Sequence, residues 1–170
     1  MLLAGPYPGS SQEGSLTRDL KAILDAGIRS VISLVEEDEE VGAFEAGDHF
    51  DAYADELEAL GEERDIIVEI QNHAIGYRTV PTDQEMAFLL DAVDAEIDGR
   101  NSPTLIHCSD GHGRSALVVG CYLARHGVAQ GKAALEKIKE LRSAVPGLAE
   151  HSCPDNIVQE RFVTRWKEGR

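Results

Sequence analysis

One continuous stretch of sequence constrains the fold more than any other. It contains a short apolar strand, Thr104–His107, then the glycine-containing segment Cys108–Arg114, and then a strongly apolar helix over Ser115–His126 that ends before Gly127. A strand that leads through such a loop into a helix forms an anion site, because backbone N–H groups and the positive end of the helix dipole point to one place. The stretch therefore predicts a buried strand, an anion-binding loop and a central buried helix.

Strands and helices alternate along the chain, and this alternation predicts an α/β fold with a central sheet of four or five mostly parallel strands flanked by helices. The apolar run Ile66-Ile67-Val68 predicts a strand buried on both faces. Thr82-Asp83-Gln84-Glu85 is a capping box that predicts the start of a helix. The predicted strands are Leu2–Ala4, Arg29–Val35, Asp65–Gln71 and Thr104–His107. The predicted helices are Leu16–Leu24, His49–Leu60, the one opened by Thr82, Ser115–His126, Lys132–Ser143 and Pro154–Lys167.

Length and composition favour one globular domain over residues 1–170, with 42% hydrophobic and 28% charged residues. The formal net charge of −15 argues against nucleic acid and anionic membranes as partners. No apolar run reaches the ~20 residues of a membrane helix, and the segment 1–8 lacks the basic region of a signal peptide. Three widely spaced cysteines favour free thiols in a reducing compartment. We therefore expect a cytoplasmic monomer.

The residue types of the loop each have a chemical role. Loop amides and the helix dipole stabilise Cys108 as a thiolate, which can attack phosphorus and form a phosphocysteine. The planar fork of Arg114 matches two phosphoryl oxygens, and the Ser115 hydroxyl can donate to the sulfur. Gly111 and Gly113 allow close approach to the anion. A buried free cysteine followed by an incidental arginine is the alternative, and it leaves this whole context unexplained. The predicted phosphate-binding residues are Ser109, Asp110, Gly111, His112, Gly113 and Arg114.

The segment His107-Cys108-Ser109-Asp110-Gly111-His112-Gly113-Arg114-Ser115 resembles the phosphate-binding loop of cysteine-based protein tyrosine and dual-specificity phosphatases, His-Cys-x-x-Gly-x-x-Arg-Ser/Thr. Leu3–Gly9 and Val118–Gly127 look like segments of small microbial and plant members, and Pro154–Trp166 looks like their closing helix. The resemblance implies a dual-specificity phosphatase-like fold. It also implies hydrolysis of phosphomonoesters, in a phosphorylated protein or a small molecule. No metal or other cofactor is implied, because histidines and carboxylates show no ligand spacing.

The family protonates the leaving oxygen with an aspartate upstream of the nucleophile, and this chain departs from that pattern. Asn72 stands at the acid's place, and asparagine cannot donate a catalytic proton. The acid could be His73, whose titration range suits the task, or Asp110, because myotubularins carry a similar Ser-Asp-Gly. The alternatives without a catalytic role are that His73 is an exposed loop histidine and that Asp110 is a carboxylate that stabilises the loop. The third possibility is a pseudophosphatase, which binds phosphorylated partners without turnover.

Other features carry weaker predictions. The acidic run Glu36–Glu40 is typical of a solvated loop, although it could favour basic peptides at the site. His112 should lie at the pocket rim, where its cation would assist phosphate binding, or simply be a surface histidine. We expect Cys121 to pack in the core and Cys153 to be incidental. The alternative is that either one protects Cys108 by a transient disulfide under oxidation.

Overall fold

The computed structural model describes residues 1–8, 14–36, 52–145 and 152–170. Within these ranges, strands and helices alternate along the chain as predicted. The strands are β1 (Leu2–Gly5), β2 (Ser30–Ser33), β3 (Glu69–Asn72) and β4 (Thr104–His107). The helices are α1 (Leu16–Asp25), α3 (Ala54–Glu62), α4 (Asp83–Arg100), α5 (Arg114–Arg125), α6 (Lys132–Ser143) and α7 (Ile157–Arg165).

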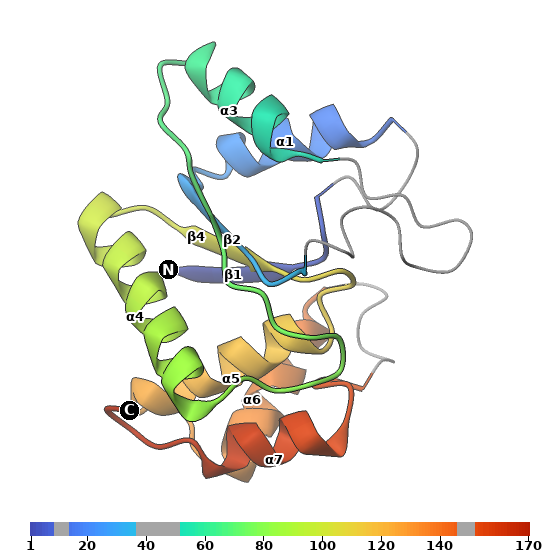
Figure 1. The fold of residues 1–170 in the computed structure, drawn as a ribbon, viewed down its shortest axis with the longest axis vertical. Helices are drawn as coiled ribbons and strands as arrows, with labels where there is room; N and C mark the ends of the chain where they lie inside the picture. The colour runs from blue at the N-terminus through green and yellow to red at the C-terminus, as the bar shows by residue number, and fades with distance from the viewer. Residues whose placement is uncertain (9–13, 37–51, 146–151) are drawn as a thin grey trace.

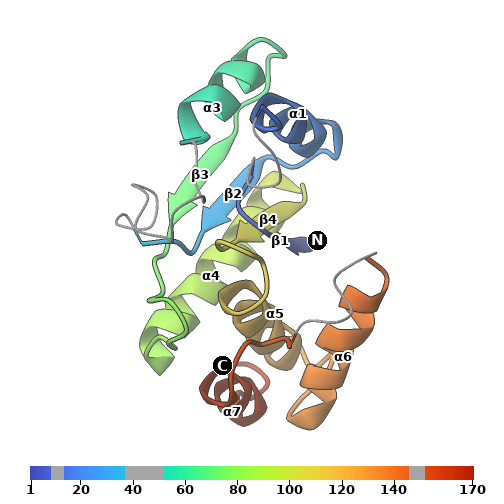
Figure 2. The same cartoon turned by 90° about the vertical axis from the view of Figure 1, so that its right-hand side faces the viewer.

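The strands form one four-stranded sheet in the order β1-β4-β2-β3, and every pair of neighbours is parallel. Figure 2 shows the strands side by side in this order. In Figure 1, α1 and α3 cover one face of the sheet, and α4 to α7 lie on the other. Helices on both faces are what a parallel sheet requires, because its middle strands must be buried on both sides. All residues of β2 and β4 are buried. The predicted α/β fold with a central parallel sheet is confirmed.

Adjacent residues of the middle strands contribute to different hydrophobic clusters, one on each face. Val31 and Leu105 pack with the side chains of α1 and α3. Ile32 and Ile106 pack with those of α4, α5 and α7, including the fully buried Trp166 just after α7. This alternation follows from the twofold period of a strand. The sheet therefore separates two cores, and its middle strands are held firmly from both sides.

The register aligns the carboxyl ends of the strands at one edge of the sheet. His107 pairs with Gly5 on one side and with Ser33 on the other, and Ser33 pairs with Asn72. The segments that follow these residues leave the sheet together at this edge. Ligand sites of open parallel sheets form at the carboxyl edge, so the fold places the Cys108–Arg114 loop where such a site is expected.

Several predicted boundaries agree closely with the structure. β4 and α6 have the predicted limits, and α1 begins at the predicted residue. The capping box before α4 is formed: the Glu85 amide donates to Thr82 Oγ1 over 3.2 Å, and the Thr82 amide donates to Glu85 Oε2 over 2.7 Å. The limits of these elements could be predicted because apolar periodicity and capping residues within each segment indicate where it begins and ends.

The third strand differs from its prediction. It begins at Glu69, and the run Ile66-Ile67-Val68 precedes it. The prediction that this run is a strand buried on both faces was wrong, since Ile67 is 79% exposed. The physical reason is position. Among the described strands β3 pairs only with β2, so it lies at the edge of the sheet, and Asp65 at φ 56° turns the chain shortly before it.

The last helix is shorter than predicted. It begins at Ile157 because the Asn156 side chain caps it, accepting from the amides of Val158 (2.9 Å) and Gln159 (3.1 Å). Residues 49–51, with which a helix was predicted to start, and residues 37–40 of the acidic run lie outside the described residues. None of the described helices combines the length and apolar character that crossing a membrane requires.

Candidate active site

The segment Cys108–Arg114, which we call the phosphate loop, connects β4 to the N-terminus of α5. Its backbone is fixed against β1. The Tyr7 amide donates to the Ser109 carbonyl over 3.0 Å. Gly111 has φ 74°, and a Cβ there would lie 2.7 Å from the carbonyl carbon of Gly5. Glycine is therefore required at 111 both for its backbone conformation and for the close approach to β1.

Arg114 is folded back over the phosphate loop and is 2% exposed. Its Nη1 donates to the Ile75 carbonyl over 3.0 Å and to the Leu34 carbonyl over 3.3 Å. Its Nη2 donates to Ser109 Oγ over 3.0 Å. The guanidinium carbon also lies 5.7 Å from the centre of the Tyr77 ring. The end of β2, the segment after β3 and the loop itself therefore fix the position of the guanidinium.

The Cys108 thiol is 1% exposed and lies at the base of the loop. Its Sγ is 3.7 Å from Asp110 Oδ1, and the same oxygen accepts from the His112 amide over 2.9 Å. The Asp110 side chain thus bridges the Cys108 thiol and a loop amide. This contact fits the loop-stabilising alternative, and it also places a carboxyl group near any atom bound to the sulfur.

His107 supports the backbone of Cys108 from inside the sheet. Its Nε2 is 2.7 Å from the Tyr53 hydroxyl, and its Nδ1 is 3.4 Å from the Cys108 carbonyl oxygen. Burial, with a smaller contribution from the Arg114 charge, lowers the pKa of His107 to about 4, against the opposing hydrogen bond to Cys108. His107 is therefore neutral near pH 7. The tautomer that satisfies both contacts donates from Nδ1 and accepts at Nε2. Sequence reasoning did not identify Tyr53, which is far from His107 in the chain.

The rim of the loop on the α6 side includes His112. Arg142 donates from Nη1 to the Gly111 carbonyl over 3.0 Å, and its Nη2 contacts Nδ1 of His112. Ser115 is buried, and its hydroxyl donates to the Gly5 carbonyl over 3.4 Å. The predicted donation from Ser115 to the sulfur is thus not the contact formed in this structure.

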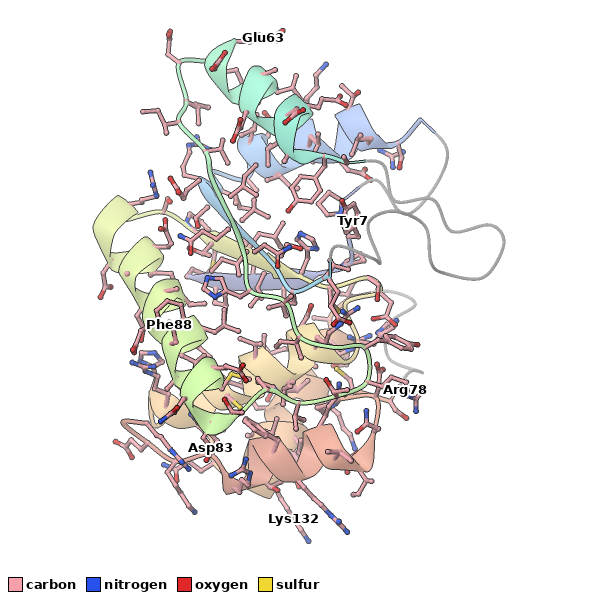
Figure 3. The ribbon with its side chains drawn as sticks, in the orientation of Figure 1. Tyr7, Glu63, Arg78, Asp83, Phe88 and Lys132 are labelled. Atoms are coloured by element: carbon pink, nitrogen blue, oxygen red, sulfur yellow. The ribbon has the colours of Figure 1, made fainter. Side chains whose placement is uncertain are left out.

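Asn72, at the family's upstream acid position, and its neighbour His73 both hydrogen-bond to groups outside the loop. The exposed Asn72 donates from Nδ2 to the Val35 carbonyl over 3.1 Å. His73 Nε2 is 3.1 Å from Gln71 Oε1, its ring centre is 5.7 Å from that of Phe88 on α4, and burial lowers its pKa. In Figure 3, Phe88 lies at the opposite side of the molecule from Arg78, which follows the segment that binds Arg114. A role for His73 as the acid stays a prediction that these contacts do not favour.

A carboxyl group that sequence reasoning missed lies against the loop. A Cβ placed on Gly113 would stand 2.9 Å from Cγ of Asp155, so the Asp155 side chain packs directly on that glycine. Burial raises the pKa of Asp155, and the charge of Asp110 adds to the effect. The segment Pro154–Trp166 was recognised only as a closing helix. The polar residues Asp155-Asn156 near the start of this segment resemble an ordinary helix cap. The sequence therefore did not indicate that Asp155 lies at the site.

The two other cysteines differ in their surroundings. Cys121 is fully buried in α5, and burial raises the pKa of its thiol far above its usual range. Cys153 is also buried, and its thiol donates to the His112 carbonyl over 3.3 Å, while burial raises its pKa to about 11. Cys153 therefore supports the back of the phosphate loop. A transient disulfide with Cys108 stays a prediction. In the parts of the chain that the structure describes, no group of three or more His, Cys, Asp or Glu side chains could hold a metal ion.

A thiol at the base of a loop between a strand and a helix, with an arginine folded back over that loop, is the arrangement typical of cysteine-dependent phosphatases. Comparison with known protein families agrees with this class. Residues 9–158 match the family model PTP-SAK, described as "Swiss Army Knife protein, DSP-PTPase phosphatase domain". The chain belongs to this family of dual-specificity-type phosphatase domains.

Individual relatives support the same assignment. The chain is 35% identical over 103 residues to "Putative tyrosine phosphatase 067L" of Invertebrate iridescent virus 3, which is 56% of this chain and 42% of the viral protein. It thus spans about two fifths of the length of that curated relative. Among solved structures, kinase associated phosphatase superposes with a TM-score of 0.69 at 18% identity, covering 93% of this chain and 80% of the other. PTPMT1 superposes with a TM-score of 0.59 at 23% identity, covering 96% and 89%. These likenesses show the dual-specificity phosphatase fold.

Proposed function

We propose that this protein hydrolyses phosphomonoesters through a phosphocysteine intermediate on Cys108. The observation that carries the proposal is the fixed position of the Arg114 guanidinium above the phosphate loop. Acceptors on Ile75, Leu34 and Ser109, all in the described part of the chain, hold it. A guanidinium that is already ordered loses little conformational freedom when it binds two phosphoryl oxygens. The loop is therefore organised for a phosphoryl group before substrate arrives.

The reaction has two steps. The Cys108 thiolate attacks phosphorus, the bond between phosphorus and the leaving oxygen breaks, and that oxygen takes up a proton. Backbone amides of Ser109 to Arg114, with the Arg114 side chain, hold the phosphoryl oxygens as charge moves onto them. Water then attacks the phosphocysteine and breaks the bond between phosphorus and sulfur. Phosphate leaves, and the thiolate is restored. Throughout both steps, neutral His107 keeps the Cys108 backbone in place.

The substrate class that we propose is a phosphorylated protein. Two carboxyl groups lie on the loop, those of Asp110 and Asp155, and the chain carries a net charge of −15. Both features disfavour leaving groups that bear further phosphates. PTPMT1, which shares the fold, has been solved in complex with PI(5)P. Tyr77, 46% exposed beside Arg114, offers an apolar surface to a phosphorylated side chain instead.

One observation favours a second candidate function. The residue at the family's acid position, Asn72, cannot donate a catalytic proton, and its amide is already engaged with Val35. A protein without any acid would bind phosphorylated partners and release them unchanged. The two functions differ in their dependence on the leaving group. An aryl phosphate needs little acid assistance, whereas an alkyl phosphate needs much.

The experiment that tests the proposal is hydrolysis of para-nitrophenyl phosphate by the wild type and by Cys108→Ser, from about pH 5 to about pH 8. We expect thiol-dependent turnover that falls to background in the variant. We also expect the phosphocysteine form of the wild type to be trapped by acid quench. A wild type that is inactive at every pH, yet binds vanadate in a manner that Arg114→Ala abolishes, would establish the binding function instead.

A further inference from the structure

The proposed reaction needs a proton donor on the open side of the phosphate loop, and the residues considered from the sequence supply it poorly. Asn72 cannot donate, and His73 packs against α4. Asp110 lies beside the nucleophile, where its carboxylate oxygen accepts from the His112 amide. A better-placed donor would be a carboxyl group that reaches the loop from another element.

Asp155 reaches the loop from the segment before α7. A Cβ on Gly113 would stand 2.9 Å from Cγ of Asp155, so the carboxyl group lies directly on the loop residue that precedes Arg114. Gly113 has an ordinary φ of −88°. Backbone conformation therefore does not require glycine there, and the space that a side chain would fill is taken by the carboxyl group.

Two hydrogen bonds fix the position of the Asp155 segment against the chain that also holds Arg114. Asn156 Nδ2 donates to the Arg78 carbonyl over 3.1 Å, and Gln159 Nε2 donates to the Thr79 carbonyl over 3.2 Å. Residues 78 and 79 closely follow Ile75, whose carbonyl accepts from Arg114. The carboxyl group, the guanidinium and the loop are therefore held in one rigid arrangement, as proton transfer requires.

A buried acceptor next to Asp155 indicates which protonation state the site favours. Gln159 is fully buried, and its Oε1 finds no hydrogen-bond donor among the described residues. This oxygen points at the same space, 3.2 Å from the position of a Cβ on Gly113. A buried acceptor without a donor is unfavourable. A carboxylic acid can donate to it, whereas a carboxylate would set two acceptors against each other.

We propose that Asp155 is the general acid of the first step and the general base of the second, in place of the upstream aspartate that the family uses. The inference rests on the proposed phosphatase function. As the bond between phosphorus and the leaving oxygen breaks, that oxygen takes the proton of the Asp155 carboxyl group. The resulting carboxylate then takes a proton from the water that attacks the phosphocysteine. Phosphate, the Cys108 thiolate and protonated Asp155 result.

Charged groups around Asp155 tune this role. Burial raises its pKa, and Asp110 raises it further, while His112, Arg78 and Arg114 oppose both. Cys153, on its own segment, is a buried neutral thiol. A general acid must be protonated to act, so kcat should fall as pH rises through its pKa. The raised pKa moves this loss toward neutral pH compared with an ordinary carboxyl group.

The test compares Asp155→Asn with the wild type on para-nitrophenyl phosphate and on an alkyl phosphate such as a phosphoserine peptide. We expect kcat for the alkyl phosphate to fall by about 10²–10⁴-fold, and kcat for the aryl phosphate to fall by less than about tenfold. The basic limb of the aryl pH profile should also disappear. Vanadate inhibition should be retained, which shows that the variant folds. Asp98→Asn makes the same change at an exposed position of α4 and should change kcat for neither substrate.

Gly113→Ala provides a second test, since alanine suits the backbone but its Cβ would displace the Asp155 carboxyl group. Like Asp155→Asn, it should lower kcat much more for the alkyl phosphate than for the aryl phosphate. The inference is overturned if Asp155→Asn affects both substrates equally or neither, or if Asp110→Asn or His73→Asn alone shows the selective loss. In those cases Cys108-dependent turnover by the wild type would still uphold the phosphatase function. Absence of such turnover would overturn both proposals.

Discussion

The buried His107 should make the stability of the protein depend on pH between about 7 and 5. The ring is fully buried against Tyr53, and its pKa is about 4 in the folded protein, compared with 6.5 for an ordinary histidine. The unfolded chain therefore takes up a proton before the folded one does. The stabilisation is fully present above pH 6.5 and is lost as pH falls from there toward 4.

The magnitude follows from the two pKa values of His107. They differ by about 2.5, and each whole unit corresponds to about 1.4 kcal/mol. The full loss below pH 4 is therefore ~3 kcal/mol. At pH 5 the unfolded histidine is largely protonated and the folded one is largely neutral, so ~2 kcal/mol is already lost. This is a large fraction of the 5–15 kcal/mol that is typical of a domain.

The assay is urea unfolding at about pH 7 and about pH 5, for the wild type and for His107→Asn. Between the two pH values, the wild type should lose ~2 kcal/mol more than the variant, or roughly 1 M more in its urea midpoint. Tyr53→Phe removes the hydroxyl but keeps the buried ring, so it should retain most of the pH dependence. Equal losses in the wild type and His107→Asn would refute the assignment of a neutral buried imidazole.

Three further substitutions test the loop and its surroundings. Arg114→Lys keeps the charge but cannot reach Leu34, Ile75 and Ser109 together, so the free energy of unfolding should fall by ~2–4 kcal/mol in urea titrations and kcat by at least about 100-fold. Gly111→Ala forces alanine to φ 74° and sets its Cβ against Gly5; a loss of ~2–5 kcal/mol is expected in thermal unfolding. Thr82→Ala removes the α4 cap and should cost ~1 kcal/mol without changing kcat for para-nitrophenyl phosphate.

The strand, loop and helix around Cys108 could be predicted because their signals are local. A buried apolar strand, glycines in the loop and an apolar helix follow each other without interruption, and the structure has β4 and α5 at those places. The start of β3 could not be predicted in this way. Ile66-Ile67-Val68 has the composition of a buried strand, but an edge strand lacks the second neighbour that would bury it.

Contacts between distant parts of the chain could not be predicted from the sequence. Nothing near Tyr53 indicates that its hydroxyl meets His107, and nothing near Asp155 indicates that it lies on Gly113. The prediction that a helix begins at Pro154 would have put Asp155 into its first turn. The cap at Asn156 delays the helix instead, and leaves Asp155 on the non-helical segment before α7, from which its side chain reaches the loop.

A carboxylate beside an anion site is unfavourable, whereas a protonated carboxyl group is not. This difference links the protonation of Asp155 to the binding of an anion in the phosphate loop. A phosphoryl dianion in the loop repels a carboxylate, so substrate binding should favour the protonated form of Asp155. By linkage, protonated Asp155 favours binding of the dianion to the same extent. Arg114 stabilises the bound anion in either case. Binding of substrate and protonation of Asp155 are thus one coupled event. Such coupling does not depend on where the acid lies in the chain, so a residue after the nucleophile can replace the upstream aspartate.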